Sequence, residues 1–162
     1  MDLVSRLISL FLIIILSPIF LVTSCFCLLF QGRPVLFKQK RVGYNYSHFK
    51  IYKFRSMIEG SGNLITFKND KRITIFGRFL RKTKIDEIPQ LINILKGDMR
   101  FIGPRPEVLC YFDKKKFKFL KKIKPGISDF ASILLRDEEA ILFKIGGNNP
   151  YQKILPLKIQ LA

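Results

Sequence analysis

An adjacent pair of carboxylates, Asp86 and Glu87, is the part of the sequence best suited to chemistry. Cations surround the pair in the chain, at Arg81, Lys82, Lys84, Arg100 and Arg105. A carboxylate amid cations is held ionised. An ionised aspartate can attack phosphorus, or it can bind Mg²⁺ together with its neighbour. The pattern therefore indicates phosphoryl chemistry, while ordinary capping of a helix start by acidic residues remains the alternative interpretation.

Basic side chains suited to phosphate stand on both sides of the acid pair. In the stretch FIGPRP, Pro104 and Pro106 fix the backbone around Arg105, whose planar fork matches phosphate oxygens. In YKFRSM, Lys53 and Arg55 alternate with aromatic residues and would share one face of a strand. That face either binds phosphate or is simply solvated, and the spacing does not decide between the two.

Helix signals follow the acid pair and would position it. With Asp86 as the N-cap, Pro89 falls in the first turn, where its missing N–H does no harm. Thr83 could also serve as the cap, with Asp86 in a capping box, but Pro89 would then cost a hydrogen bond. Apolar residues between positions 91 and 95 supply a buried stripe, and Gly97 ends the helix.

Short alternating runs dominate the middle of the chain. Two strands are predicted at 34–42 (PVLFKQKRV) and 48–57 (HFKIYKFRSM), joined by a turn at 43–47 that contains Gly and Asn. Residues 65–77 form either a further hairpin or, from Ile73 to Leu80, the beginning of a helix. Short strands beside helices predict an α+β domain.

The segment from Leu7 to Phe30 carries no charge over 24 residues, and about 20 apolar residues span a bilayer. A Ser17-Pro18 pair near its middle predicts a kink, because proline removes a backbone donor. Basic residues flank both ends, and such residues favour the cytoplasmic side. The residues are compatible with a kinked spanning helix or with a re-entrant hairpin that leaves by the face it entered.

The formal net charge of +17 points to a polyanionic partner, and a hydrophobic content of 48% favours a membrane over nucleic acid. Residues 114–124 contain seven lysines interleaved with apolar residues. These residues form either a solvated helix face or an interfacial helix that contacts anionic lipid. A role in binding nucleic acid is disfavoured, because no base-reading motif accompanies the basic stretch.

The succession of RVG, FKIYKFRSM, LRKTKIDEIPQLINILKGDMRFIGPRPE and KIKPGIS resembles the bacterial sugar transferase family over residues 1–136. Its members are small monotopic phosphoglycosyl transferases that initiate surface glycan assembly. The resemblance implies a re-entrant membrane helix over 1–31, broken at Ser17-Pro18, followed by a mixed helical and short-strand catalytic domain over 32–136. Interfacial helices complete the expected fold. Residues 137–162 form a divergent C-terminal segment, either truncated or natively short.

The resemblance also implies a reaction. Such enzymes transfer a sugar 1-phosphate from a UDP-sugar to polyprenyl phosphate, on the cytoplasmic face of the bacterial inner membrane. By the resemblance, Asp86 is the nucleophile that forms a covalent phosphosugar intermediate. Glu87 binds Mg²⁺ with it, and Arg81 contacts the lipid phosphate.

Further phosphate contacts follow from the same comparison. Lys53 matches the lysine of the family's YKF strand, and Arg105 matches the arginine of its GPRP turn. Arg55 and Arg136 complete the expected phosphate-binding set, although the surroundings of Arg136 differ from those in familiar members. An inactive membrane scaffold that has lost donor binding is therefore the alternative. The sugar, the glycan pathway and the oligomeric state stay open.

Overall fold

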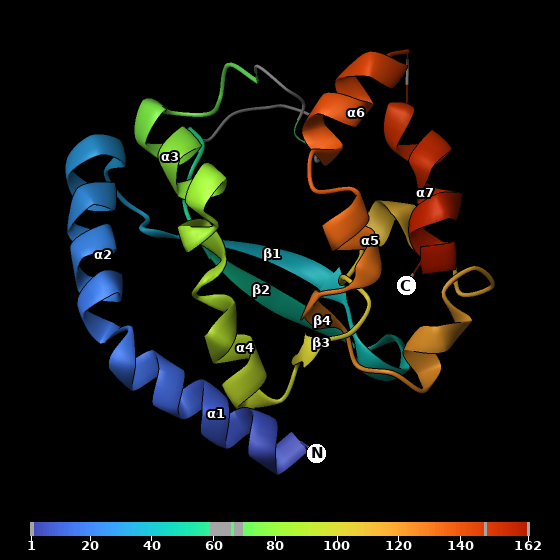
Figure 1. Ribbon diagram of the computed structural model, residues 1–162, viewed down its shortest axis with the longest axis horizontal. Coiled ribbons are helices and arrows are strands. Elements are labelled where there is room, and N and C mark those ends of the chain that lie inside the picture. Colours follow the sequence, from blue (N-terminus) through green and yellow to red (C-terminus); the bar gives the residue numbers. More distant parts are fainter. Residues whose placement is uncertain (1, 59–65, 67–69, 148, 162) are drawn as a thin grey trace.

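An antiparallel β-hairpin lies at the centre of the fold, between two groups of helices (Figure 1). In the computed structural model, which describes residues 2–58, 66, 70–147 and 149–161, β1 (Leu36–Val42) pairs with β2 (His48–Phe54). A short 3₁₀ turn, Tyr44–Tyr46, joins them, with Asn45 in the left-handed region. Both predicted strands and the turn between them are confirmed, because β-branched and aromatic residues alternate on either side of small polar ones.

A second, two-stranded sheet holds the GPRP turn. In it, β3 (Arg100–Ile102) runs parallel to β4 (Gly126–Ser128). A side chain at Gly126 would collide with the backbone of Ile102 and Gly103, so glycine is required for this close approach. The sheet thereby anchors the residues directly before Pro104.

The apolar N-terminal segment folds as two helices rather than one. α1 (Asp2–Ile15) and α2 (Ser17–Gln31) are bent by 62° at a break directly before Ser17-Pro18. The predicted break is confirmed, and proline is its cause, since Pro18 has no N–H for the helical ladder. Within the described residues, no unbroken helix has the length and apolar character of a membrane span, and the bent pair reaches both only when taken together.

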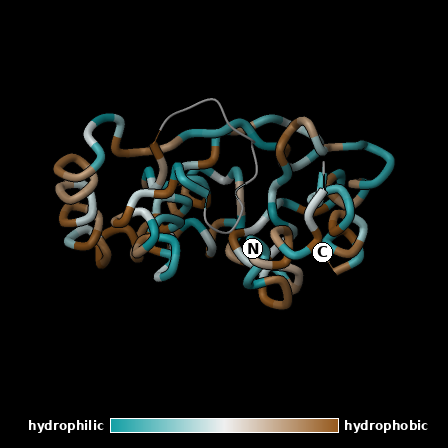
Figure 2. The backbone as a smooth tube through the Cα atoms, turned by 90° about the horizontal axis from the view of Figure 1, so that it is seen from above, coloured by the Kyte–Doolittle hydropathy of each residue, from teal (hydrophilic) through white to brown (hydrophobic). Residues whose placement is uncertain are grey.

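One face of this helix pair belongs to the protein core. Leu12 and Leu16 pack against Leu91 and Ile94, and the buried Ser9 hydroxyl donates to the carbonyl of Leu91 at 2.6 Å. The opposite face is exposed, and Figure 2 shows hydrophobic colouring along most of the pair. Its exposed apolar residues include Leu3, Leu7, Phe11, Ile14, Leu21, Leu29 and Phe30. An exposed apolar surface of this extent is typical of an interaction face.

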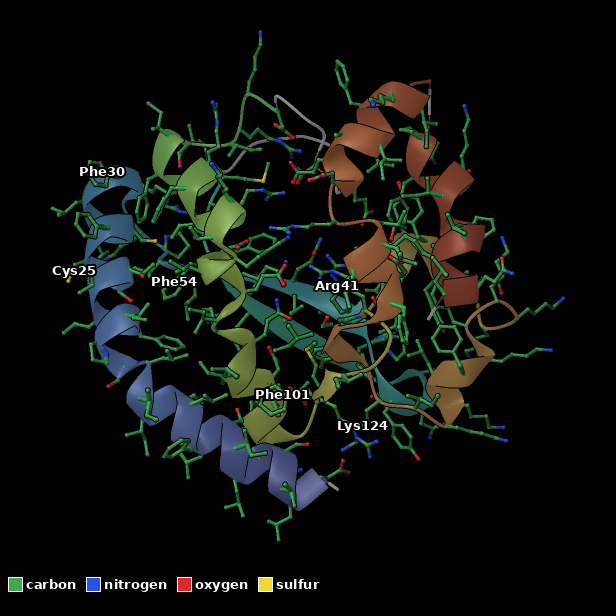
Figure 3. All side chains as sticks on the ribbon, viewed as in Figure 1. Cys25, Phe30, Arg41, Phe54, Phe101 and Lys124 are labelled. Carbon is green, nitrogen blue, oxygen red and sulfur yellow. The ribbon has the colours of Figure 1, made fainter. Side chains whose placement is uncertain are left out.

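Farther along the pair, α2 closes a small cluster around Phe54 at the end of β2. Figure 3 shows the ring of Phe54 between α2 and the central hairpin. Phe20 of α2 lies 5.7 Å from it between ring centroids, and Cys27 and Leu80 complete the buried cluster. The helix pair is thus packed along the domain from α4 to the end of β2.

α3 (Ile75–Thr83) begins at Thr74, whose hydroxyl accepts a hydrogen bond from the amide of Gly77 at 2.8 Å. Of the two interpretations offered for this stretch, the helix is confirmed. The alternative hairpin lies partly at residues 65 and 67–69, outside the described residues. The helix ends at Lys84, which adopts a left-handed conformation with φ of 60°.

The acid pair lies in a 3₁₀ turn, Ile85–Glu87, between α3 and α4 (Gln90–Lys96). Both predicted N-caps are wrong. Pro89 precedes α4 without a side-chain cap, and the Thr83 hydroxyl donates back to the carbonyl of Phe79. α3 therefore continues through Thr83, and Lys84, in a left-handed conformation, separates it from the turn that holds Asp86. The predicted end of the helix at Gly97 is confirmed, with φ of 84°.

Three helices, α5 (Phe130–Leu134), α6 (Glu138–Ile145) and α7 (Pro150–Leu161), form the other side of the domain. Their core joins the far end of β1. The buried members of that core are Val42, Phe117, Leu120, Leu142, Tyr151, Ile154 and Leu155.

The lysine-rich stretch is not the long helix that both interpretations required. Within residues 114–124, the regular structure is a single 3₁₀ turn, Lys118–Lys121. Phe117 and Leu120 are 4% and 1% exposed, so they face the core rather than a headgroup layer. The expectation of an interfacial helix here is wrong, because the stretch forms no continuous helix and two of its apolar side chains belong to the core.

Candidate active site

Three elements bring charged side chains together at the acid pair. The left-handed turn at Lys84 places Glu87 beside the end of β2 and the GPRP turn. Glu87 Oε1 accepts hydrogen bonds from Lys53 Nζ at 2.8 Å and from the Arg105 guanidinium at 2.6 Å. Residues separated by 34 and 18 positions in the sequence thus share one carboxylate oxygen.

The charges of this cluster depend on one another. Burial alone would raise the pKa of Glu87, but the nearby Arg105 and Lys53 outweigh it and hold the pKa well below its usual range. Glu87 in turn raises the pKa of Arg105. Burial and the positive charge of Arg105 lower the pKa of Lys53 to about 8, against the opposing attraction of Glu87. Glu87 is therefore a fixed carboxylate that balances two cations next to Asp86.

Asp86 is the unsatisfied member of the cluster. It is only 5% exposed, and its buried Oδ1 accepts no hydrogen bond from any part of the chain that the structure describes. Burial raises the pKa of Asp86, and the lowering influence of Lys53 does not overcome it. The sequence-based expectation that surrounding cations would dominate this carboxyl group is therefore wrong: desolvation is the larger effect.

An unpaired, buried carboxylate oxygen beside a second carboxylate fits a divalent cation. Mg²⁺ is commonly held by one or two carboxylates, with substrate phosphates and water as the other ligands. Across the described ranges, no group of three or more His, Cys, Asp or Glu side chains is placed to hold a metal ion. Asp86 and Glu87 would thus supply two ligands, and the substrate would have to supply others.

A cavity of about 1220 Å³ opens onto the acid pair. The predicted site residues Lys53, Arg55, Arg81, Asp86, Glu87, Arg105 and Arg136 all line it. Its walls come from opposite sides of the molecule: one from β2, α3 and the GPRP turn, the other from the segment between α5 and α7 (Figure 1). The exposed side chain of Arg136 belongs to the second wall.

Arg81 lies in the last turn of α3 and reaches across this cavity. Its guanidinium forms an ion pair with Glu139 of α6, 58 residues away in the sequence. The pair is partly open to solvent, with 26% of the Arg81 side chain and 39% of the Glu139 side chain exposed. The Arg81 guanidinium, which was expected to contact a phosphate, is thus paired with a carboxylate in this structure.

Arg55 has partners other than the phosphate expected for it. Its guanidinium donates to the carbonyls of Gln31 and Gly32, and at 2.8 Å to that of Arg33. These carbonyls stand at the C-terminal end of α2, and Arg55 is 8% exposed. A cation there satisfies carbonyls that the helix leaves unpaired and complements the negative end of its dipole. In this structure Arg55 fastens α2 to the end of β2.

We expect Arg55→Lys to lower the free energy of unfolding by about 1–3 kcal/mol, since lysine keeps the charge but cannot fork across three carbonyls. Thermal unfolding in detergent micelles measures the loss. Arg33→Lys, at an exposed position, is the matched control and should be neutral. A variant of Arg55 with native stability but weaker substrate binding would instead support the phosphate contact predicted from sequence.

A hydrogen-bond network in the cavity lining was missed by sequence reasoning. The Tyr151 hydroxyl donates to Glu107 Oε2 at 2.6 Å, and Lys158 Nζ donates to the same hydroxyl at 3.0 Å and to Glu138 at 3.0 Å. It ties α7 to the residue that follows the GPRP turn. The available signal was the spacing of Tyr151 and Lys158, seven residues apart and so on one helix face.

Comparison with known proteins gives a consistent result. A profile of the family described as bacterial sugar transferase matches residues 1–157. A UDP-N-acetylgalactosamine-undecaprenyl-phosphate N-acetylgalactosaminephosphotransferase of Aeromonas hydrophila is 39% identical over 142 residues, which are 83% of this chain and 33% of that protein. A UDP-glucose:undecaprenyl-phosphate glucose-1-phosphate transferase of Klebsiella pneumoniae is 37% identical over 135 residues, 78% of this chain and 29% of that protein.

The matched relatives are longer than this chain. The uncharacterized sugar transferase EpsL of Bacillus subtilis is 41% identical over 130 residues, which are 77% of this chain and 63% of that protein. The chain therefore spans about a third of the two named transferases and less than two thirds of EpsL.

Proposed function

Because the chain belongs to the bacterial sugar transferase family, we propose that it transfers a sugar 1-phosphate from a UDP-sugar to polyprenyl phosphate, the first step of a surface glycan. The observation that carries the proposal is the Asp86 carboxyl group, buried and unpaired among the described residues, at a cavity lined by Lys53, Arg81 and Arg105. The donors and acceptors named for the similar transferases suggest the classes of donor and acceptor proposed here.

The reaction proceeds in two displacements. In the first, a carboxylate oxygen of Asp86 attacks the phosphorus that bears the sugar; the bond from that phosphorus to the bridging oxygen breaks, and UMP leaves with the electron pair. In the second, a phosphate oxygen of the polyprenyl phosphate attacks the same phosphorus and the Asp86 carboxylate is released. The lipid product is a polyprenyl diphosphate sugar, and the enzyme is unchanged.

The other charged residues fix geometry and offset charge. Glu87 holds Lys53 and Arg105 beside Asp86, and these cations lie where negative charge accumulates on the phosphoryl oxygens. Asp86 and Glu87 are also the ligands we assign to Mg²⁺, which when bound neutralises phosphate charge and lowers the pKa of a coordinating carboxyl group. Arg81 is assigned to the phosphate of the lipid acceptor, and Arg136 to the donor from the opposite wall.

We place the chain on the cytoplasmic face of the bacterial inner membrane, with α1 and α2 as a re-entrant pair. The bend of 62° before Ser17-Pro18 and the exposed apolar face of the pair support this placement. A helix end at Gln31 that is fastened to β2 by Arg55 would keep the cavity close to the bilayer surface, where the lipid phosphate lies.

The proposal is tested with the purified full chain and radiolabelled UDP-sugars, beginning with UDP-N-acetylgalactosamine and UDP-glucose. Without acceptor, we expect one donor to label the protein covalently when Mg²⁺ is present, and addition of undecaprenyl phosphate to move the label into lipid. A chain that binds membranes but yields neither labelled protein nor labelled lipid with any donor would be the inactive scaffold.

A further inference from the structure

An ion pair joins the two walls of the cavity at its Arg81 side. Arg81 belongs to α3, packed against the N-terminal helices, whereas Glu139 belongs to the first turn of α6 on the opposite side of the molecule (Figure 1). Both residues line the cavity. The contact therefore joins the two walls, rather than being part of the packing within one wall.

A carboxylate and a phosphate compete for the same donor. The guanidinium of Arg81 presents a planar fork that accepts either anion, and one anion in the fork excludes the other. The Glu139 carboxylate thus takes the place of the lipid phosphate that the proposed function assigns to Arg81. The partial exposure of both side chains means that the pair is only weakly stabilising and can exchange its anion through water.

We propose that Glu139 is a displaceable internal ligand of Arg81, which holds α6 against α3 until the phosphate of the lipid acceptor takes its place. The inference rests on the role of Arg81 in the proposed function and assigns to Glu139 the control of acceptor affinity. Entry of the phosphate frees α6 from α3. The cavity then opens on the side where the lipid approaches.

The test is Glu139→Gln, which keeps the shape of the side chain and removes the competing charge. Because a partly exposed pair is worth little, we expect the KM for undecaprenyl phosphate to fall by about 1.4- to 5-fold. The fall in KM should exceed any change in the rate of covalent labelling by the UDP-sugar, which requires no acceptor. Asp137→Asn is the matched control: it removes one negative charge two residues away, from an exposed side chain that makes no helix-capping hydrogen bond.

Equilibrium binding of radiolabelled undecaprenyl phosphate, measured without donor, separates this inference from the proposed function. Tighter binding by Glu139→Gln alone supports the internal ligand, even for a protein that proves unable to transfer sugar. Unchanged or weaker binding overturns it, as does an equal gain in Asp137→Asn. In an Arg81→Met background, Glu139→Gln should have no further effect on binding; a remaining gain would mean that Glu139 acts on something other than Arg81.

Discussion

Asp86→Asn is expected to abolish sugar-phosphate transfer while leaving the protein folded and bound to membranes. The amide is nearly isosteric with the carboxyl group but is not a nucleophile, so we expect a loss on the order of 10³-fold or more. The folded-state pKa of Asp86 lies above its ordinary value, so its ionised form costs stability at any pH above both values. Asparagine lacks that cost, and thermal stability at neutral pH should therefore equal or exceed that of the native protein.

Three measurements check this prediction: covalent labelling by the donor, formation of lipid-linked sugar, and sedimentation with membranes. Asp137→Asn serves again as the control, because it makes the same chemical change at an exposed position and should keep most of the activity. Transfer by Asp86→Asn at a rate near that of the native protein would remove the nucleophile from this position. A destabilised variant would show instead that the carboxylate is needed for folding.

Glu87→Gln has the second large expected effect, on stability and activity together. The substitution leaves Lys53 and Arg105 next to each other without their shared counter-charge. Breaking a buried pair by removing one partner costs about 3–5 kcal/mol; since these side chains are 12–32% exposed, we expect the lower end, about 3 kcal/mol. Activity should fall with it, because both cations lose their counter-charge and a proposed Mg²⁺ ligand is removed.

The pH dependence of this loss identifies its cause. Without Glu87, the pKa of Lys53 should fall further below its present value of about 8. A depressed lysine pKa costs stability in full below the folded-state pKa, and the cost shrinks as pH rises from there towards the unfolded-state pKa. The variant and the native protein differ in this cost only while Lys53 is still protonated in the folded native protein, below about pH 8. The deficit of the variant should therefore be larger near about pH 6 than near about pH 8.

Unfolding followed by circular dichroism at both pH values provides the measurement. The double variant Lys53→Met/Glu87→Gln is the control, since it removes one of the two unpaired cations. It should regain part of the stability but none of the activity. Equal deficits at both pH values would show that Lys53 does not titrate as described.

Local patterns in the sequence were sufficient for much of the fold. The strands beside residues 43–47, the break at Ser17-Pro18 and the helix end at Gly97 depend on backbone preferences of a few neighbouring residues. The residue types around the acid pair suggested a shared phosphate site with Arg105, but only the family resemblance joined Lys53 firmly to it, because no spacing rule connects that strand with the turn. Here the resemblance placed residues together that local physics could not.

What the sequence could not reveal depends on burial and on distant partners. The cations near Asp86 in the sequence predicted a lowered pKa for its carboxyl group. Burial raises that pKa instead, and burial is set by the tertiary packing. The spacing of Lys53 and Arg55 predicted that both face the same ligand. Arg55 instead donates to backbone carbonyls more than 20 residues earlier in the chain. The high lysine content of residues 114–124 predicted a surface segment, although Phe117 and Leu120 within it belong to the core.

The shared core of α1 and α4 means that the N-terminal helices are not a detachable anchor. Deleting residues 1–31 to obtain a water-soluble catalytic fragment would uncover Ile94 and Phe54 and remove the Gln31 carbonyl, one of the three that accept hydrogen bonds from Arg55. We expect such a fragment to aggregate. The helices that carry the exposed apolar face thus also complete the core behind the acid pair, so we expect neither part to fold without the other.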